Sequence, residues 1–262
     1  MTRKIFEPQG SIGKRTYTIL GTLTFVVVFL AWFVVTNTGL VDPSFLPTPQ
    51  HTVESAQQLF TDHDFVKDIG ISTYRVLAGF LISAVIALPV GLLIGTYAPI
   101  DAFIEPITSF IRYLPATAFI PLFILWIGID ESEKIALIIM GSLPQLILMV
   151  AVDVRKVPHD LVEVSYTLGT KPSRVLTKII LPASMPHIVD SLRMVLGWAW
   201  TYVVVAEMVG ASAGIGYMMI QSQRMLNVGN IFVGLLTIGL LGLFFDFLFM
   251  GIKKVFFRWS ET

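Results

Sequence analysis

Six stretches of this chain are apolar over a length that matches the hydrocarbon core of a membrane. That core is about 30 Å thick, so a helix needs about 17 to 25 apolar residues to cross it. Backbone polar groups cannot stay unpaired in lipid, and helices satisfy them within one segment. The stretches cover residues 17–36, 73–97, 107–127, 135–152, 188–206 and 231–252. The sequence therefore predicts an all-α, polytopic membrane protein with six transmembrane helices.

The composition agrees with a chain embedded in lipid. Of its 262 residues, 55% are hydrophobic and 14% are charged, whereas about a quarter of the residues of soluble domains are charged. The net charge of zero provides no general field for nucleic acid. The chain has no cysteine, and its four histidines lack metal-ligand spacing. We therefore expect no nucleic-acid partner, no disulfide and no metal site.

Positively charged residues are unevenly distributed between the connections, which predicts the orientation of the chain. Twelve lie at the two ends and in the central connection: Arg3, Lys4, Lys14, Arg15, Arg155, Lys156, Lys171, Arg174, Lys178, Lys253, Lys254 and Arg258. The connections on the other side hold three, Lys67, Lys134 and Arg224. Because positively charged short loops stay in the cytoplasm, both termini and the central loop are expected there.

This topology predicts one transmembrane domain over residues 1–262. Its expected parts are a cytoplasmic N-terminal segment at 1–16, an extracytoplasmic loop at 37–72 and a cytoplasmic loop at 153–187. The first apolar stretch follows four cationic residues, as a secretion signal does, but it lacks a small-residue cleavage site. We expect it to remain as a membrane anchor.

The central loop carries helix signals of its own. Asp160 and Glu163 have the spacing of a capping box and predict a helix that begins near Leu161. Gly169 is suited to end that helix in a left-handed conformation. Pro172 is suited to start a second helix, which we expect to end at Pro182. Leu161, Val164 and Leu168 would share one apolar face of the first helix.

The same loop has the spacing of a known family motif. Glu163, six residues before Gly169, is followed at a fixed distance by Ile179, Leu181 and Pro182. This pattern resembles the EAA loop of ABC importer permeases, with Val164 and Ser165 in place of the two alanines. The resemblance implies a type I permease fold in which this loop is the docking point of the ATPase. The implied docking residues are Asp160, Leu161, Glu163, Val164, Leu168, Gly169 and Pro172.

Further motifs resemble the nitrate, sulfonate, taurine and bicarbonate branch of these permeases. They are Leu46-Pro47-Thr48-Pro49, Ser72-Thr73-Tyr74-Arg75, Trp126-Ile127-Gly128-Ile129, Val205-Ala206-Glu207 and Gly214-Ile215-Gly216. The resemblance implies a bacterial inner-membrane homodimer with two cytoplasmic ATPase subunits and an extracytoplasmic solute-binding protein. The implied solute is a small oxyanion. The alternatives are another small solute, such as a thiamine precursor, and an ion-coupled secondary transporter that uses Glu207 and Asp246.

No enzymatic signature accompanies these motifs. The sequence lacks the phosphate-binding G-x-x-x-x-G-K-[ST] loop and the HExxH and G-x-S-x-G motifs of hydrolases. We therefore expect a non-catalytic chain that binds no cofactor itself, with ATP and Mg²⁺ held by the partner ATPase.

Ionisable residues within apolar stretches are costly in lipid, so they indicate a cavity or an ion pair. Arg112, Arg193 and Glu207 are the candidates for a solute pathway. Arg112 precedes Leu114-Pro115, where the helix should bend, and it would either meet an anion or pair with Glu105 or a neighbouring helix. Arg193 and Glu207 fall about 40° apart on one helix face, which would line the pathway or a helix contact.

Three further features of the sequence lead to expectations about packing and position. Arg75 and Asp190 lie near the ends of their stretches and should reach the membrane interface. Gly91 and Gly95 form a G-x-x-x-G pattern, for which internal packing is the favoured interpretation. The segment from Glu207 to Asn227 is too short to span and is expected to form a surface or re-entrant helix that gates the outer mouth.

Overall fold

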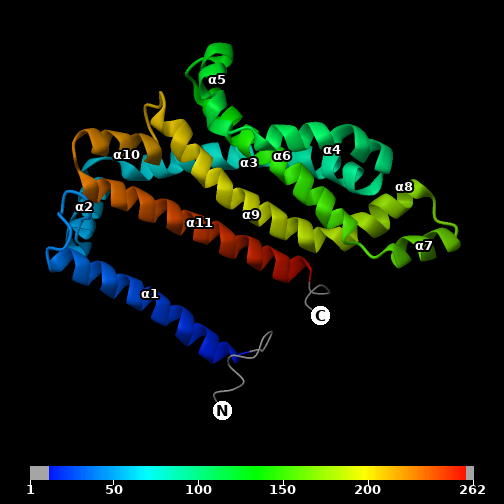
Figure 1. Ribbon diagram of the computed structural model, residues 1–262, viewed down its shortest axis with the longest axis horizontal. Coiled ribbons are helices and arrows are strands. Elements are labelled where there is room, and N and C mark those ends of the chain that lie inside the picture. Colours follow the sequence, from blue (N-terminus) through cyan, green and yellow to red (C-terminus); the bar gives the residue numbers. More distant parts are fainter. Residues whose placement is uncertain (1–11, 258–262) are drawn as a thin grey trace.

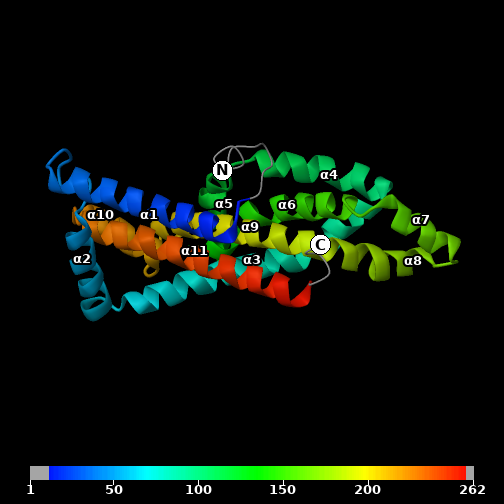
Figure 2. The same cartoon turned by 90° about the horizontal axis from the view of Figure 1, so that it is seen from below.

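The computed structural model describes residues 12–257, and the fold of this part is entirely helical (Figures 1 and 2). The helices are α1 (Lys14–Asn37), α2 (Pro49–Asp62), α3 (Phe65–Thr96), α4 (Ala98–Tyr113), α5 (Ile120–Ile127), α6 (Glu131–Arg155), α7 (His159–Thr167), α8 (Pro172–Val175), α9 (Leu181–Met208), α10 (Ile215–Arg224) and α11 (Val228–Phe256). A 3₁₀ turn, η2 (Ala116–Phe119), precedes α5, and a π-helical turn, η3 (Leu176–Ile180), joins α8 to α9. Arg3, Lys4, Arg258 and most of the expected segment 1–16 lie outside the described residues.

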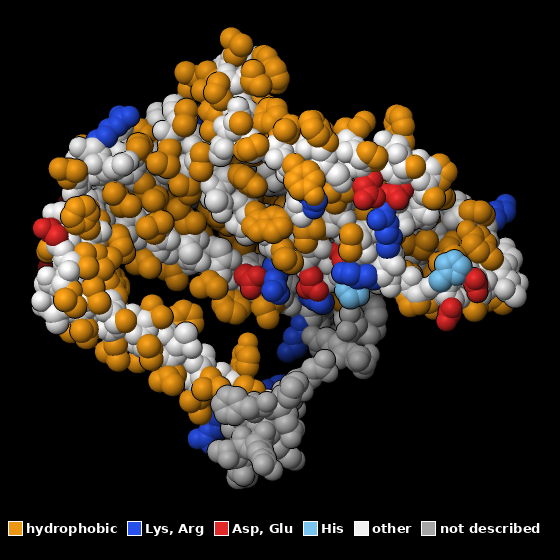
Figure 3. Space-filling model, viewed as in Figure 1, with side chains coloured by type: hydrophobic (Ala, Val, Ile, Leu, Met, Phe, Trp, Pro, Cys, Tyr) orange, Lys and Arg blue, Asp and Glu red, His pale blue; other side chains and the backbone are white. Residues whose placement is uncertain are grey.

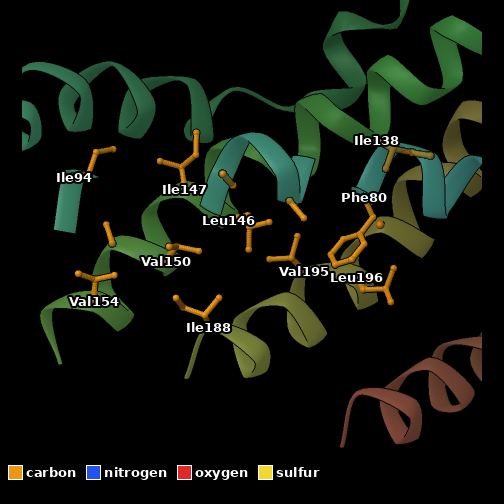
Figure 4. Close-up of a cluster of buried hydrophobic side chains, with 14 of the residues drawn as sticks. Phe80, Ile94, Ile138, Leu146, Ile147, Val150, Val154, Ile188, Val195 and Leu196 are labelled. Atoms are coloured by element: carbon orange, nitrogen blue, oxygen red, sulfur yellow. The ribbon is translucent and has the colours of Figure 1, made fainter. Parts of the chain in front are cut away.

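Helices α3, α6 and α9 form the centre of the bundle. Their contact surface is a single apolar cluster, part of which is drawn in Figure 4: Phe80, Ile94, Ile138, Leu146, Ile147, Val150, Val154, Ile188, Val195 and Leu196. Gly91 and Gly95 lie at a close contact between α3 and α6, since a Cβ added at Gly91 would be 2.7 Å from the carbonyl oxygen of Ile147. The G-x-x-x-G pattern therefore serves internal packing, as expected.

Helix α1 stands apart from this bundle (Figure 1). The apolar window of its 24 residues is 0% buried. Trp32 anchors its end near α2: the indole Nε1 donates to the carbonyl oxygen of Pro47 at 3.0 Å, and the ring stacks on Phe232. Figure 3 shows hydrophobic side chains over α1 and α5. An apolar surface of this extent suits contact with lipid.

The expected spans are largely present, but the third is not one straight helix. Five helical segments are long and apolar enough to cross a membrane: α1, α3, α6, the continuous segment of α8, η3 and α9, and α11. The expected span 107–127 is divided at Leu114–Pro115, where α4 and the η2–α5 segment meet at 85°. Proline has no N–H and holds the residue before it in an extended conformation, and Leu114 has ψ 130°. The break is the predicted bend, sharper than a kink within one helix.

The expected loop at 37–72 also contains regular structure. It holds α2, whose first turn is capped by Thr48: its hydroxyl accepts from the backbone N–H of His51 at 3.1 Å. Helix α3 begins at Phe65, eight residues before the predicted start at residue 73. The sequence did not reveal α2, because this helix is amphipathic and lacks the apolar length that identified the other helices.

The bundle has two ends that differ in their functional residues (Figure 1). We call them the α10 end, where α3 and α6 begin and α9 terminates, and the α7 end, where α3 and α6 terminate and α9 begins. Helices α3, α6 and α9 connect the two.

Candidate functional site

The loop between α6 and α9 forms a helix, a glycine turn and a second helix, as the sequence predicts. Helix α7 ends in a Schellman motif: the N–H of Thr170 donates to the carbonyl of Ser165 at 3.0 Å, and that of Gly169 to Tyr166 at 2.9 Å. Gly169 has φ +76°, a conformation that favours glycine. Pro172 then occupies the first turn of α8.

Two details of this loop differ from prediction. Helix α7 starts at His159 after Pro158, and no side chain caps it. Glu163 instead lies 3.1 Å from Nδ1 of His159, one turn earlier on the exposed surface, so the predicted capping box is absent. The chain also remains helical through Pro182. In the π turn, the N–H of Leu181 donates to the carbonyl oxygen of Leu176, and this wider turn accommodates the proline that follows.

One face of α7 is apolar and exposed. Leu161 is 47% exposed, Val164 58% and Leu168 79%. Beside this stripe, Ser165 is buried and Val162 packs against the central apolar cluster. The other predicted docking residues, Asp160, Glu163, Gly169 and Pro172, are exposed as well. The helix therefore presents a free apolar stripe beside polar groups at the α7 end.

Two adjoining cavities, of about 330 and 290 Å³, lie beside α6 and α9. Arg112 and Gln145 line both of them and so join them into one groove, which we call the Arg112 groove. Its part toward the α7 end includes Asp153, Lys156, His187, Asp190, Ser191 and Met194, and its part nearer the α10 end includes Met140, Gly141, Pro144, Trp198 and Tyr202.

Arg112 has no carboxylate partner among residues 12–257. Its guanidinium donates to the hydroxyl of Tyr113 at 3.2 Å and lies 5.0 Å from the centre of that ring. Glu105, the partner considered from the sequence, bonds to Arg155 at 3.0 Å instead. Within the groove, the carboxylates of Asp153 and Asp190 are already engaged by lysines. The guanidinium of Arg112 is therefore available to an anion.

Arg193 takes part in a contact between α9 and α11. It bonds to Asp246 at 2.8 Å, which supplies the partner that the sequence left open for Asp246. One turn away, Asp190 accepts from Nζ of Lys253 at 2.6 Å. These two ion pairs connect the two helices, so Arg193 lies at a helix contact.

Glu207 lies in a buried cluster at the α10 end. Its side chain is 0% exposed and accepts from Arg75 at 2.8 Å. Arg75 is only 2% exposed, so the prediction that it reaches the membrane interface was wrong. The reason is charge pairing: two carboxylates, Glu207 and Glu131, surround the guanidinium and offset the cost of burying its charge. Glu131 was not recognised from the sequence because it lies 56 residues from Arg75.

The three pathway candidates therefore occupy different places. Arg112 lines the groove, Arg193 joins α9 to α11, and Glu207 is enclosed at the α10 end. Arg193 and Glu207 are both ion-paired to other helices, which agrees with the helix-contact interpretation of their shared face.

Comparison with known proteins places the chain in a family. Residues 87–261 match the family described as binding-protein-dependent transport system inner membrane component. A probable ABC transporter permease of Brucella abortus is 39% identical over 92% of this chain and 96% of its own length. The putative aliphatic sulfonates permease SsuC of Bacillus subtilis is 32% identical over 95% of this chain and 90% of its own. The bicarbonate permease CmpB of Synechococcus elongatus is 28% identical over 87% and 84%.

A solved structure shows the same fold. A chain of the MetNI methionine ABC transporter, in an inward-facing conformation, superposes with a TM-score of 0.67 at 22% identity and covers 73% of this chain and 95% of that one. Together with the helical bundle and the loop at the α7 end, these matches identify the chain as a member of the binding-protein-dependent transport system inner membrane components, within the sulfonate, taurine and bicarbonate permeases of ABC importers.

Proposed function

We propose that this permease carries a small oxyanion of the sulfonate, taurine, bicarbonate or nitrate class into the cytoplasm past Arg112. The observation that carries the proposal is a guanidinium in a membrane groove with no carboxylate partner among residues 12–257. A guanidinium presents a planar fork of donors that fits oxyanions. Ion coupling through Glu207 and Asp246 receives no support, since arginines already pair with both.

The proposed assembly places the α7 end and both termini in the cytoplasm. The excess of lysine and arginine in the central loop supports this orientation. The assembly contains two ATPase subunits, which hold ATP and Mg²⁺. Each binds the exposed stripe of Leu161, Val164 and Leu168 on one copy of the permease. A second copy of the chain completes the pathway, and a solute-binding protein delivers the anion at the α10 end. This chain itself is not catalytic.

Docking is tested by a charge on the stripe. Leu168→Glu should abolish copurification of the ATPase without lowering the amount of permease in the membrane, because the side chain is 79% exposed. Phe45→Glu is the matched control, since Phe45 is 78% exposed and precedes α2. Unchanged copurification with Leu168→Glu would contradict docking at this stripe.

The solute is tested by uptake of taurine, methanesulfonate, bicarbonate and nitrate into cells that express the whole transporter. Arg112→Gln should lower uptake of the transported anion at least about tenfold, the effect of one charged hydrogen bond, whereas Arg112→Lys should retain part of it. Equal amounts of permease in the membrane are the control. Loss of the protein from the membrane would favour a structural role for Arg112, and unchanged uptake would exclude contact with the anion.

A further inference from the structure

The α10 end contains a buried hydrogen-bonded cluster around Glu207. Ser72 lies 2.7 Å from one oxygen of this carboxylate, and the backbone N–H of Gly216 donates to the other at 2.8 Å. The neighbouring N–H groups at the start of α10 are also satisfied: Gly214 donates to Asp68 at 2.7 Å and Ile215 to Ser72 at 2.9 Å. The cluster thus joins α3, α9 and the start of α10 through bonds that are buried, except for the part-buried bond to Asp68.

Arg75 extends this cluster to α6. Its Nη1 donates to Glu207 at 2.8 Å and to the carbonyl of Ala213, also at 2.8 Å. Its Nε and Nη2 form a two-pronged contact with Glu131 at 2.6 and 2.5 Å. One guanidinium therefore bridges the first residue of α6 and the end of α9.

The two carboxylates that share Arg75 differ in their surroundings. Glu207 is 0% exposed and has three groups of donors, from Ser72, Arg75 and Gly216. Glu131 is 55% exposed and is held here by Arg75. If Glu131 moves away, water can solvate its charge while Arg75 remains neutralised by Glu207. The Glu131 contact is therefore the one that can separate at low cost.

The connections beside these carboxylates touch each other. Ile129 precedes α6, and Gly210 follows α9 with φ +71°. A Cβ built on Gly210 would lie 2.6 Å from Cγ2 and 3.9 Å from Cβ of Ile129. The Arg75–Glu131 pair thus holds together two connections that lie so close that there is no room for a side chain at Gly210.

Behind this contact lies an apolar layer that separates it from the Arg112 groove. Ala116, Ile120, Leu137 and Ala206 form one buried cluster, with Met140 and Tyr202 packed against it. Ala206 adjoins Glu207 in the chain, whereas Met140 and Tyr202 also line the groove. From the α10 end inward, the order is thus charged cluster, apolar layer and polar groove.

We propose that Arg75 is a latch at the extracytoplasmic mouth of the pathway, with Glu207 as its fixed partner and Glu131 as its releasable partner. Separation of Glu131 from Arg75 lets the α5–α6 connection move away from the α9–α10 connection and exposes the apolar layer. This role rests on the proposed transport function. Arg75 acts as a positioning residue and does not contact the solute.

The first experiment locks the latch. The chain has no cysteine, so the double variant Ile129→Cys/Gly210→Cys carries just two thiols, and the Cβ separation of 3.9 Å lies in the disulfide range. Oxidation in membranes should form the bond and stop uptake of whichever of the four tested anions the parent imports. Reduction should restore uptake. Ile129→Cys/Gly210→Ala is the control, since it repeats the backbone change with one thiol.

The second experiment opens the latch and measures access to the apolar layer, so it does not depend on which solute is transported. Ala206→Cys places a thiol in the apolar layer, where the parent residue is 0% exposed. A membrane-impermeant maleimide added outside should modify it about tenfold faster when Glu131→Gln is also present, the effect of losing one charged hydrogen-bonded pair. Arg75→Lys should act in the same direction, because one ammonium cannot form the fork to Glu131. Glu105→Gln, the same change in the Arg155 contact, should leave the rate unchanged.

These outcomes separate the latch from the transport proposal. Uptake that continues through the oxidised cross-link, or an Ala206→Cys labelling rate that Glu131→Gln does not change, would overturn the latch. A parent protein that imports none of the four anions would instead count against the proposed solute, and the labelling rates would still report on the latch.

Discussion

Each end of α6 is held by an arginine that binds two carboxylates, and the two arrangements differ mainly in their exposure to water. At the α10 end, Arg75 is 2% exposed and joins Glu131 to Glu207. At the α7 end, Arg155 is 40% exposed and bonds to Asp101 and Glu105 on α4. The chemical groups are the same, but a buried charge depends on its partners far more than a hydrated one does. The arrangement at the α10 end should therefore be energetically critical and that at the α7 end dispensable.

Removal of Arg75 is the strongest test of the difference between the two arginines, because a large loss of stability is expected. Arg75→Met leaves Glu207 buried without its counter-ion and should cost about 3 to 5 kcal/mol of stability. Thermal denaturation of the purified permease measures the change. Addition of Glu207→Gln to the same variant should recover part of the loss, because the stranded charge is removed. A melting temperature equal to that of the parent would show that Glu207 is solvated, contrary to the structure.

Two glycines with positive φ, Gly214 beside the Arg75 cluster and Gly169 at the α7 end, provide a second comparison. Gly214 has φ +116°, and a Cβ there would lie 2.5 Å from the carboxylate of Glu207. Gly214→Ala should therefore combine backbone strain with displacement of Glu207, at a cost of about 2 to 3 kcal/mol. Gly239→Ala in α11 is the control, since nothing lies within 4 Å of a Cβ there. Equal thermal stability of the two variants would mean that the start of α10 is loosely held.

Gly169 at the α7 end also has a positive φ, but it lies in open space. Its φ is +76°, and nothing lies within 4 Å of an added Cβ. Gly169→Asp should cost about 1 to 2 kcal/mol through strain alone, leave the protein inserted and abolish transport through the altered α7. Gly169→Asn is the milder comparison because asparagine adopts this conformation more readily. Unchanged uptake with Gly169→Asp, alongside unchanged copurification of the ATPase, would contradict the importance of this turn.

The smallest effect is expected at Arg155. Arg155→Gln should change stability by less than about 1 kcal/mol, since exposed ion pairs contribute little. Raising the salt concentration should reduce even this difference. Melting curves at low and high salt provide the measurement. A loss as large as that of Arg75→Met would show that burial does not explain the difference between the two ends.

Local patterns in the sequence predicted much of the fold. Apolar length identified α1, α3, α6, α9 and α11, because crossing lipid imposes a minimum number of residues. Gly169 and Pro172 predicted the turn and the second helix of the central loop, since both act on their own backbone. The resemblance of the Glu163 to Pro182 segment to the EAA loop led to the family that the comparisons show.

The errors had two causes, ion pairs between residues distant in sequence and an unusual local backbone turn. Arg75 was expected at the interface because nothing near it in sequence indicates that Glu131 and Glu207 converge on it. Pro182 was expected to end a helix, but a π turn just before it accommodates the proline. Arg112 was identified from its place before the break, while its lack of a carboxylate partner in residues 12–257 could only be seen from the packing of α4 and α6.

Helix α9 joins these two ends without interruption. It runs for 28 residues from the π turn to Met208, a length of roughly 42 Å at the rise of an α-helix. Because its first residues continue the loop at the α7 end and its last turn carries Glu207, it acts mechanically as a lever arm. A tilt of about 5° about one end displaces the other by roughly 3 to 4 Å over that length, more than the reach of a hydrogen bond. In the proposed transport cycle, a small rotation imposed on the loop is thus large enough at the α10 end to carry Glu207, with Arg75 bound to it, away from Glu131.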